Sequence, residues 1–169
     1  MDKNFSVEFI WQNASEELKK KVVAFWINEG AIKQEEDAIS RSNELLAVCK
    51  DQDGNIIGVS TGVKSIYPAL KNHFLVYRSY VTPDYRHQGI AGLIYQKVYD
   101  ELNKVEVFKG HGIIGILSAF ENAHLNKDKR AVWKEHCNLT FIGFDHRGVQ
   151  LRVSYFDDAE INLPGLDNQ

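Results

Sequence analysis

The sequence predicts an α/β fold built as one domain. Strand-like and helix-like segments alternate along the chain, and the strand-like ones are rich in β-branched and aromatic residues, often at alternating positions. The 169 residues are also enough to enclose a full hydrophobic core. We place this domain at residues 1–156 and expect residues 157–169, an acidic stretch that contains a proline and a glycine, to form a mobile tail.

The first half of the chain is predicted to hold a strand, two helices and three further strands. The first helix follows Asn13 and Glu16, which can form a capping box, and it stops near Gly30. The second helix is polar, and it precedes a hairpin that turns at Asp53 and Gly54. The predicted strands are residues 5–11, 45–50, 56–65 and 74–81, and the second helix is residues 34–42.

The second half is predicted to hold two helices and three strands. Apolar residues at helical spacing predict an amphipathic helix from residue 89 to about residue 104. A second helix is predicted over residues 126–137, where Ala131, Val132 and Trp133 favour it. The remaining predicted strands are residues 113–120, 139–144 and 149–156. The predicted order is therefore β-α-α-β-β-β-α-β-α-β-β.

Composition and charge argue against several classes of function. The formal net charge of −3 disfavours nucleic acid as a partner, because nucleic acid requires a basic surface. No apolar run is long enough to cross a bilayer, and the first residues lack the apolar core of a signal peptide. Two cysteines and six scattered histidines predict neither a disulfide framework nor a metal site. We therefore expect a cytoplasmic protein with no metal, nucleic-acid or membrane partner.

The most informative stretch joins the strand at 74–81 to the helix that begins near residue 89. The connecting loop reads Arg86-His87-Gln88-Gly89-Ile90-Ala91. A helix start presents unpaired backbone N–H groups and the positive end of the helix dipole, so it attracts anions. Gly89 lets the backbone approach a bulky anion, and Arg86 adds a positive charge. The loop therefore predicts a diphosphate-binding site, and the alternative is an ordinary turn whose glycine only caps the helix.

This loop resembles the acyl-CoA loop of the GNAT superfamily of N-acetyltransferases, whose pattern is Arg/Gln-x-x-Gly-x-Gly/Ala. The predicted order of strands and helices resembles that family over nearly the whole chain. The resemblance implies a mixed, mostly antiparallel sheet flanked by helices. It also implies acetyl-CoA as co-substrate and acetyl transfer to the amine of a small molecule or a protein, with homodimers common in the family.

The family's pattern also implies which residues bind the coenzyme. Backbone groups at the end of the strand before the loop would contact the pantetheine arm, and the loop amides with Arg86 would contact the diphosphate. Trp133 stands where the family often has a tyrosine that protonates the departing thiolate, and an indole N–H is not a usable acid. The implied coenzyme-binding residues are Tyr80, Val81, Thr82, Arg86, His87, Gln88, Gly89, Ile90, Ala91 and Asn126.

Acetyl transfer to an amine requires a base that removes the ammonium proton. Glu121, just after the predicted strand at 113–120, is the first candidate for this role, although it also fits a solvated loop carboxylate. His124 and Glu36 are weaker candidates. No nucleophile for an acetyl-enzyme is evident, so we expect direct attack in a ternary complex.

Two charged side chains are candidates for binding the acceptor. Arg78 interrupts an apolar strand, so it either pairs with a carboxylate such as Glu121 or binds a carboxylate of the acceptor. Glu36 lies in an acidic run that either forms a solvated helix face or attracts a cationic amine.

Two other functions remain open at the level of sequence. The replacement of the tyrosine by Trp133 favours a non-catalytic acyl-CoA-binding module as the alternative. Residues 110–115 match the G-x-G-x-x-G pattern of dinucleotide sites, but the pattern requires a strand before it and a helix after it. Here residues 105–108 are too short for a solid strand and residues 113–117 look like a strand, which disfavours nucleotide binding.

Overall fold

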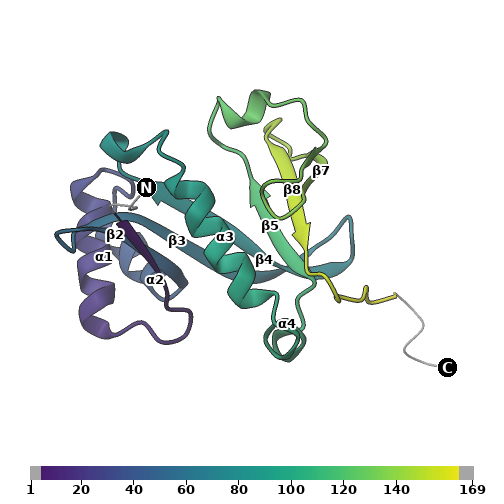
Figure 1. Cartoon of the computed structure of the whole chain (residues 1–169), viewed down its shortest axis with the longest axis horizontal. Coiled ribbons are helices and arrows are strands. Elements are labelled where there is room, and N and C mark those ends of the chain that lie inside the picture. Colours follow the sequence, from purple (N-terminus) through teal and green to yellow (C-terminus); the bar gives the residue numbers. More distant parts are fainter. Residues whose placement is uncertain (1–4, 164–169) are drawn as a thin grey trace. The chain divides into compact units, whose positions relative to one another are not determined.

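The computed structural model describes residues 5–163 and confirms the predicted α/β fold (Figure 1). Within this range the sheet has 8 strands in the order β1-β2-β3-β4-β5-β8-β7-β6. The β4–β5 pair is parallel, and the pairs β1–β2, β2–β3, β5–β8, β6–β7 and β7–β8 are antiparallel. The strands are β1 (Phe5–Phe9), β2 (Leu45–Asp51), β3 (Ile56–Tyr67), β4 (Asn72–Val81), β5 (Gly115–Ala119), β6 (Val132–Trp133), β7 (Leu139–Phe144) and β8 (Gln150–Tyr155). The helices are α1 (Glu16–Asn28), α2 (Glu35–Ser42), α3 (Ile90–Leu102) and α4 (Val105–His111).

The chain divides into two compact units. Unit 1 comprises the chain up to Gly62 together with Arg78–Val98, and unit 2 comprises Val63–Tyr77 together with the chain from Tyr99 onward. Strands β3 and β4 and helix α3 each begin in one unit and end in the other. We therefore describe each unit by itself.

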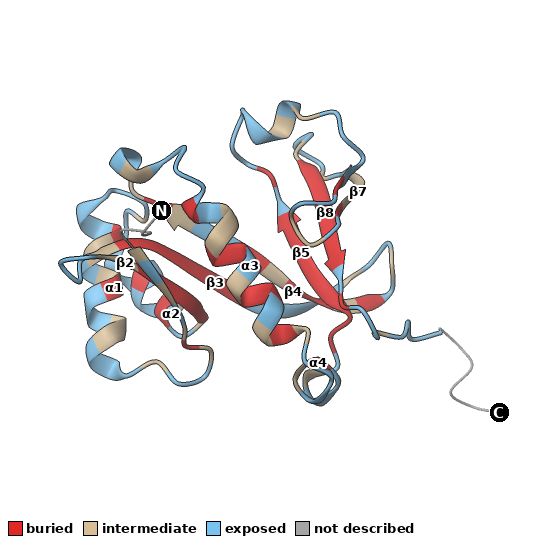
Figure 2. Cartoon of the chain, viewed as in Figure 1, coloured by how far each residue is buried: buried red, intermediate tan, exposed pale blue. Residues whose placement is uncertain are grey.

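Unit 1 forms its core between its strands and the helices α1 and α2. Helix α1 begins after Ser15, whose hydroxyl accepts a hydrogen bond from the backbone N–H of Leu18 at 3.1 Å. The predicted capping by Asn13 is therefore wrong, because the serine next to the helix takes that place. The buried residues of this core, part of the red segments in Figure 2, are Ile10, Val22, Trp26, Ala38, Leu45, Val48 and Val59.

Unit 2 contains the parallel pair β4–β5 and the C-terminal strands. The parallel pairing covers residues 75–77 of β4, whereas β4 itself continues to Val81. One hydrophobic cluster of this unit contains the buried residues Phe74, Ile114, Leu117, Leu151 and Val153. The part of the expected tail that lies within the described residues is tied to this unit, because Asn162 N–H donates to the side-chain oxygen of Asn72 at 2.8 Å. The rest of the expected tail lies outside the described residues.

One predicted helix is absent, and one unpredicted helix is present. Residues 126–137 do not form a helix: a 3₁₀ turn at Leu125–Lys127 is followed by an irregular segment and the short strand β6. Helix α4 occupies what was expected to be a plain connection, and it ends at Gly112, whose φ of +59° is left-handed. No helix in the described part of the chain is both long enough and apolar enough to span a membrane.

The absent helix has a physical explanation in the side chains of β8. The Gln150 side-chain amide donates to the carbonyl oxygens of Asn126 at 2.7 Å and Asp128 at 2.9 Å. Arg152 donates to the carbonyl oxygen of Arg130 at 2.7 Å. These carbonyl groups are the ones that a helix would pair within itself. Long side chains from a neighbouring strand therefore replace the helical hydrogen bonds.

Candidate functional site

The loop between β4 and α3 lies entirely in unit 1, and its backbone is built to expose amide groups. After β4 the chain forms a 3₁₀ turn at Pro83–Tyr85, and helix α3 starts at Ile90. His87 and Gly89 have positive φ values of 65° and 78°. A Cβ atom added to Gly89 would meet no protein atom within 4 Å, so the backbone conformation, and not lack of space, requires glycine there.

The amide groups of this loop are open. The first hydrogen bond of α3 runs from Leu93 N–H to the Gly89 carbonyl at 3.0 Å, which leaves the earlier N–H groups of the helix without an intrahelical acceptor. Among the described residues, the backbone N–H groups of residues 87–91 have no protein acceptor. Open N–H groups at a helix start can bind an anion, and the diphosphate expected from the sequence stays a prediction.

Arg86 is held in place by the end of β4. Its Nε donates to the carbonyl oxygen of Val81 at 3.0 Å, and its guanidinium carbon lies 5.5 Å from the centre of the Tyr80 ring. The side chain is exposed, and neither of its Nη groups has a protein partner within the described residues. Arg86 therefore keeps donors for an anion while two contacts fix its position.

The backbone N–H and C=O groups at the end of β4 point alternately toward β3 and away from it. Thr82 N–H donates to the Ile57 carbonyl of β3 at 3.0 Å. Because backbone groups of successive residues point to opposite sides of a strand, the Tyr80 groups also point toward β3 and the Val81 groups point away from it. Among the three expected backbone contacts, Val81 is the residue whose backbone groups point away from β3.

The side chain of Tyr80 forms a connection that the sequence did not predict. Its ring contacts the ring of Phe25 on α1, with the centroids 5.9 Å apart, and its hydroxyl donates to Oε2 of Glu29 at 3.5 Å. Glu29 lies at the C-terminal end of α1. Tyr80 and Glu29 are 51 residues apart in the sequence, so no local pattern could have indicated this pair.

The charged candidates lie on the surfaces of the two units. Arg78 and Glu36 are exposed, and Arg78 forms no ion pair within the described residues of unit 1. Glu121 lies in unit 2 and pairs with Arg147 at 3.0 Å, with 66% of its side chain exposed. Arg147 also pairs with Asp145 at 2.8 Å. The partner of Glu121 is therefore Arg147, and not Arg78 as one prediction proposed.

Asn126 and His124 also lie in unit 2, in the segment after β5. The Asn126 side chain accepts a hydrogen bond from the Gln150 N–H at 2.7 Å and donates to the Gly148 carbonyl at 3.3 Å. His124 is exposed, and its backbone N–H donates to the Asn122 side chain at 2.8 Å. The contacts of Asn126 join the segment to the β7–β8 turn.

Trp133 is a core residue of unit 2. It is 7% exposed, and its indole N–H donates to Oδ1 of Asp128 at 3.0 Å. Its ring lies 5.0 Å from the guanidinium of the buried Arg152. The hydrogen bonds that Arg130 donates hold the pKa of the Asp128 carboxyl well below its usual range. Burial lowers the pKa of the Arg152 guanidinium.

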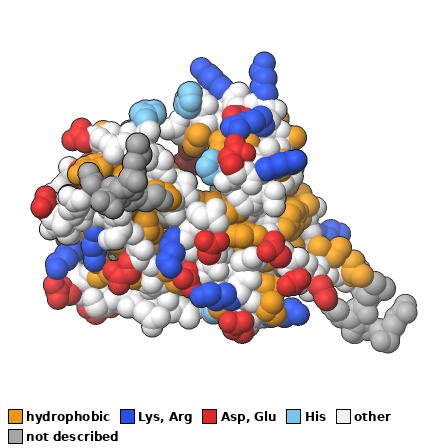
Figure 3. Space-filling model, in the orientation of Figure 1, with side chains coloured by type: hydrophobic (Ala, Val, Ile, Leu, Met, Phe, Trp, Pro, Cys, Tyr) orange, Lys and Arg blue, Asp and Glu red, His pale blue; other side chains and the backbone are white. Residues whose placement is uncertain are grey.

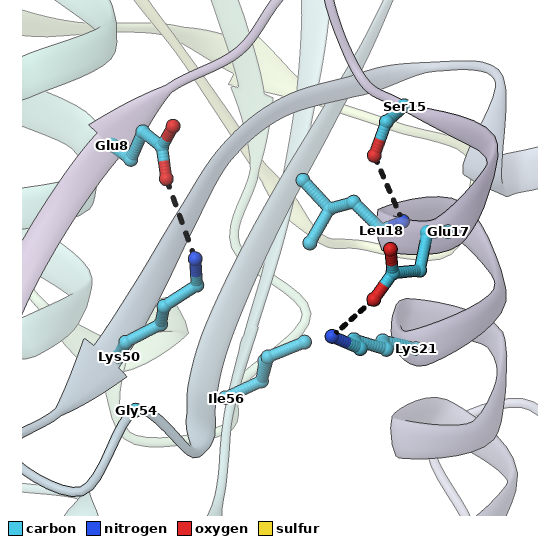
Figure 4. Close-up of a pocket in the computed structure, with 8 residues that line it drawn as sticks. All are labelled: Glu8, Ser15, Glu17, Leu18, Lys21, Lys50, Gly54 and Ile56. Carbon is cyan, nitrogen blue, oxygen red and sulfur yellow. Dashed lines mark hydrogen bonds and ion pairs between the residues drawn. The ribbon is translucent and has the colours of Figure 1, made fainter.

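A separate surface pocket lies on unit 1, where β1 and the β2–β3 turn approach α1 (Figure 4). Its volume is about 320 Å³, and none of the predicted site residues lines it. The charges in its wall are paired, Lys50 with Glu8 at 3.4 Å and Lys21 with Glu17 at 2.7 Å. Figure 3 likewise shows acidic and basic side chains intermixed on the face that it draws. The pocket therefore presents no uncompensated charge.

The G-x-G-x-x-G pattern at 110–115 runs in the wrong direction for a dinucleotide site. It starts in the last turn of α4, passes through the helix end at Gly112 and finishes at the start of β5. A dinucleotide site requires the strand first and the helix second. The structure thus agrees with the reading that disfavours nucleotide binding.

Comparison with known proteins places this geometry in a family. Residues 11–138 match the model of the acetyltransferase (GNAT) family. No curated protein sequence matches the chain significantly.

Solved structures resemble the fold at low sequence identity. A GNAT-family acetyltransferase from Streptococcus pneumoniae has a TM-score of 0.61 and 11% identity, with 90% of this chain and 99% of that chain covered. A GNAT N-acetyltransferase from Escherichia coli, solved in complex with CoA, has a TM-score of 0.58 and 14% identity, with 92% and 83% covered. A phosphinothricin acetyltransferase from Sinorhizobium meliloti, solved with acetyl-CoA, has a TM-score of 0.61 and 11% identity, with 96% and 95% covered.

Proposed function

Because this chain belongs to the acetyltransferase (GNAT) family, we propose that it transfers the acetyl group of acetyl-CoA to an amine by direct attack in a ternary complex. The amine nitrogen forms a bond to the thioester carbonyl carbon while the carbon–sulfur bond breaks. The nitrogen loses a proton, and the coenzyme leaves as the free thiol. The products are an N-acetylated acceptor and CoA.

The observation that carries this proposal is the open loop between β4 and α3. The N–H groups of residues 87–91 have no acceptor among the described residues, and Arg86 keeps both Nη groups available. Together they would hold the diphosphate of the coenzyme. The coenzyme complexes of the Escherichia coli and Sinorhizobium meliloti proteins support this choice of ligand.

Val81 is the residue that we propose to contact the coenzyme next to the reacting group. Its backbone groups point away from β3, and its N–H would polarise the thioester carbonyl as an oxyanion hole does. We propose that Tyr80 acts through its side chain, because its backbone groups point toward β3. Thr82 contributes little by its N–H, which already bonds to Ile57.

Three residues of unit 2 bear on the proton transfers of the reaction. Glu121 remains a proposed base, and its ion pair with Arg147 would have to open before it accepts a proton. Asn126 would act by holding the segment after β5, since its amide bonds to the β7–β8 turn. Trp133 is buried and offers no acid, so the thiolate would be protonated by water or by the departing ammonium proton.

The buried Trp133 also favours a second candidate function, a module that binds acyl-CoA without catalysis. Isothermal titration calorimetry with acetyl-CoA, followed by a thiol-release assay over a panel of amines, separates the two functions. The enzyme should bind acetyl-CoA and release thiol with at least one amine. Binding without release on every amine supports the module.

The role of the loop is tested with a coenzyme fragment. S-Acetylpantetheine lacks the diphosphate, so it should bind much more weakly than acetyl-CoA to the same protein. Equal affinity for both donors would contradict a diphosphate site at residues 86–91.

A further inference from the structure

Tyr80 lies between Arg86, in the loop that we propose to bind the coenzyme, and the end of α1. The guanidinium carbon of Arg86 lies 5.5 Å from the centre of the Tyr80 ring. The Tyr80 hydroxyl donates a hydrogen bond to Oε2 of Glu29 at 3.5 Å. All three residues belong to unit 1. These contacts place the carboxylate of Glu29 beside the side chain of Tyr80, one residue before Val81, which we propose to meet the acetyl group.

Glu29 is an uncompensated negative charge. It is exposed, it forms no ion pair within the described residues of unit 1, and the last turn of α1 contains no basic residue. The C-terminal end of a helix is itself electronegative, and it attracts cations. The end of α1 therefore favours a positively charged ligand.

Arg78 is an uncompensated positive charge on the same side of β4. It stands two residues before Tyr80, so both side chains leave the same face of the strand, about 7 Å apart at their Cα atoms. Arg78 is exposed and unpaired within the described residues of unit 1. A guanidinium in this state suits a carboxylate, which it can bind through two parallel hydrogen bonds.

We propose that Glu29 and Arg78 bind the acceptor and that the acceptor is a small zwitterion, an amine that also carries a carboxylate, such as an α-amino acid. Glu29 binds the ammonium group, and Arg78 binds the carboxylate. Tyr80 separates the two charges and positions Glu29. The inference rests on the proposed acetyl transfer, and it adds the class of acceptor and a residue, Glu29, that the sequence did not indicate.

The test compares acceptors that differ only in their charged groups. Thiol release from acetyl-CoA is measured with the L-amino acids and, for each active one, with its amide and with the amine that lacks the carboxylate. The native protein should prefer the amino acid in kcat/KM by about tenfold or more, because a bidentate contact is lost in the other two.

Variants then test which side chain binds which charged group of the acceptor. Arg78→Gln should raise the KM of the amino acid about tenfold and leave that of its amide unchanged, since the amide makes no such contact. Glu29→Gln should raise the KM of both acceptors. Arg41→Gln on α2 and Glu17→Gln at the opposite end of α1 are the matched controls, and they should change neither KM.

Calorimetry with acetyl-CoA separates failure of this inference from failure of the proposed function. If acetyl-CoA binds and amines are acetylated, but amino acids and their amides react equally or both variants keep the native KM, the zwitterion site is overturned while acetyl transfer stands. If acetyl-CoA does not bind, or binds without thiol release on any amine, acetyl transfer fails and the acceptor assignment fails with it.

Discussion

Arg86 and Arg152 both place a guanidinium group over aromatic rings, but one is exposed in a loop and the other is buried in a core. Arg86 is exposed in the loop between β4 and α3, lies over one aromatic ring and, within the described residues, donates one hydrogen bond to protein. Arg152 is 1% exposed in unit 2. Its guanidinium lies 5.4, 5.0 and 6.0 Å from the rings of Phe120, Trp133 and Phe141.

The two arginines differ in how many guanidinium N–H donors have no acceptor within the described residues. Arg152 donates to Oε1 of Gln150 at 2.9 Å, to the Arg130 carbonyl at 2.7 Å and to the Leu139 carbonyl at 3.5 Å. Neither Nη group of Arg86 has a protein acceptor in the part of the chain that the structure describes. A ring under a guanidinium fixes its position in both cases, and the unused donors decide whether the arginine can bind a ligand or only hold the protein together.

Removal of Arg152 should have the largest effect on stability. Arg152→Met leaves the carbonyl groups of Arg130 and Leu139 and Oε1 of Gln150 without this donor, and the loss at a buried acceptor costs about 1–3 kcal/mol. We expect the free energy of unfolding to fall by about 3 kcal/mol or more in urea titrations. Arg147→Gln, which removes an exposed arginine, should cost less than about 1 kcal/mol. Equal losses in the two variants would show that the buried contacts add nothing.

Removal of the Arg86 charge should affect binding and leave stability unchanged. Arg86→Gln should raise the Kd of acetyl-CoA about tenfold, because a charge-assisted contact to the diphosphate is lost. Its free energy of unfolding should stay within about 0.5 kcal/mol of the native value, as is usual for exposed positions. Calorimetry and urea titration on the same variant check both statements. A destabilised variant with native affinity would reverse the contrast with Arg152.

A methyl group added to the loop between β4 and α3 should have a smaller effect. Gly89→Ala places a side chain at a φ of +78°, which costs about 1 kcal/mol of stability. Gly30→Ala at the end of α1 is a matched control, because its φ is +66° and its surroundings are equally open. Both variants should lose similar stability, and only Gly89→Ala should weaken acetyl-CoA binding. Equal affinity in the two variants would speak against a ligand at the loop.

The smallest effect is expected for the contribution of Asp128 to the Tm at low pH. The pKa of Asp128 is lowered by the hydrogen bonds of Arg130, so its stabilising contribution is complete above the ordinary carboxyl pKa of about 3.9 and is lost as the pH falls below it. The native Tm should therefore drop when the pH is lowered from 5 to 2, a range of about three units around that value. Asp128→Asn should have a shallower drop over the same range. Parallel Tm curves would mean that Asp128 contributes nothing in this way.

The sequence predicted the backbone elements around the loop between β4 and α3 well, because every part of them is local. A strand, a turn, a glycine and a helix start follow one another within residues 74–102, so their relation could be read along the chain. The helix expected at 126–137 failed for the opposite reason. Its carbonyl groups are bonded by Gln150 and Arg152, more than 20 residues away. The Tyr80–Glu29 contact spans 51 residues and was likewise beyond any local pattern.

The segment before β7 has a consequence for how this protein tolerates mutation. A helix is held by many equivalent backbone hydrogen bonds, so the loss of one leaves the others intact. Here side chains of β8 take over part of that work, because Gln150 and Arg152 bond carbonyl groups of the segment at residues 126–130. The Phe141 N–H also bonds the Ala131 carbonyl at 2.8 Å, so we expect a substitution at position 150 or 152 to loosen one part of the segment and leave its pairing with β7 in place.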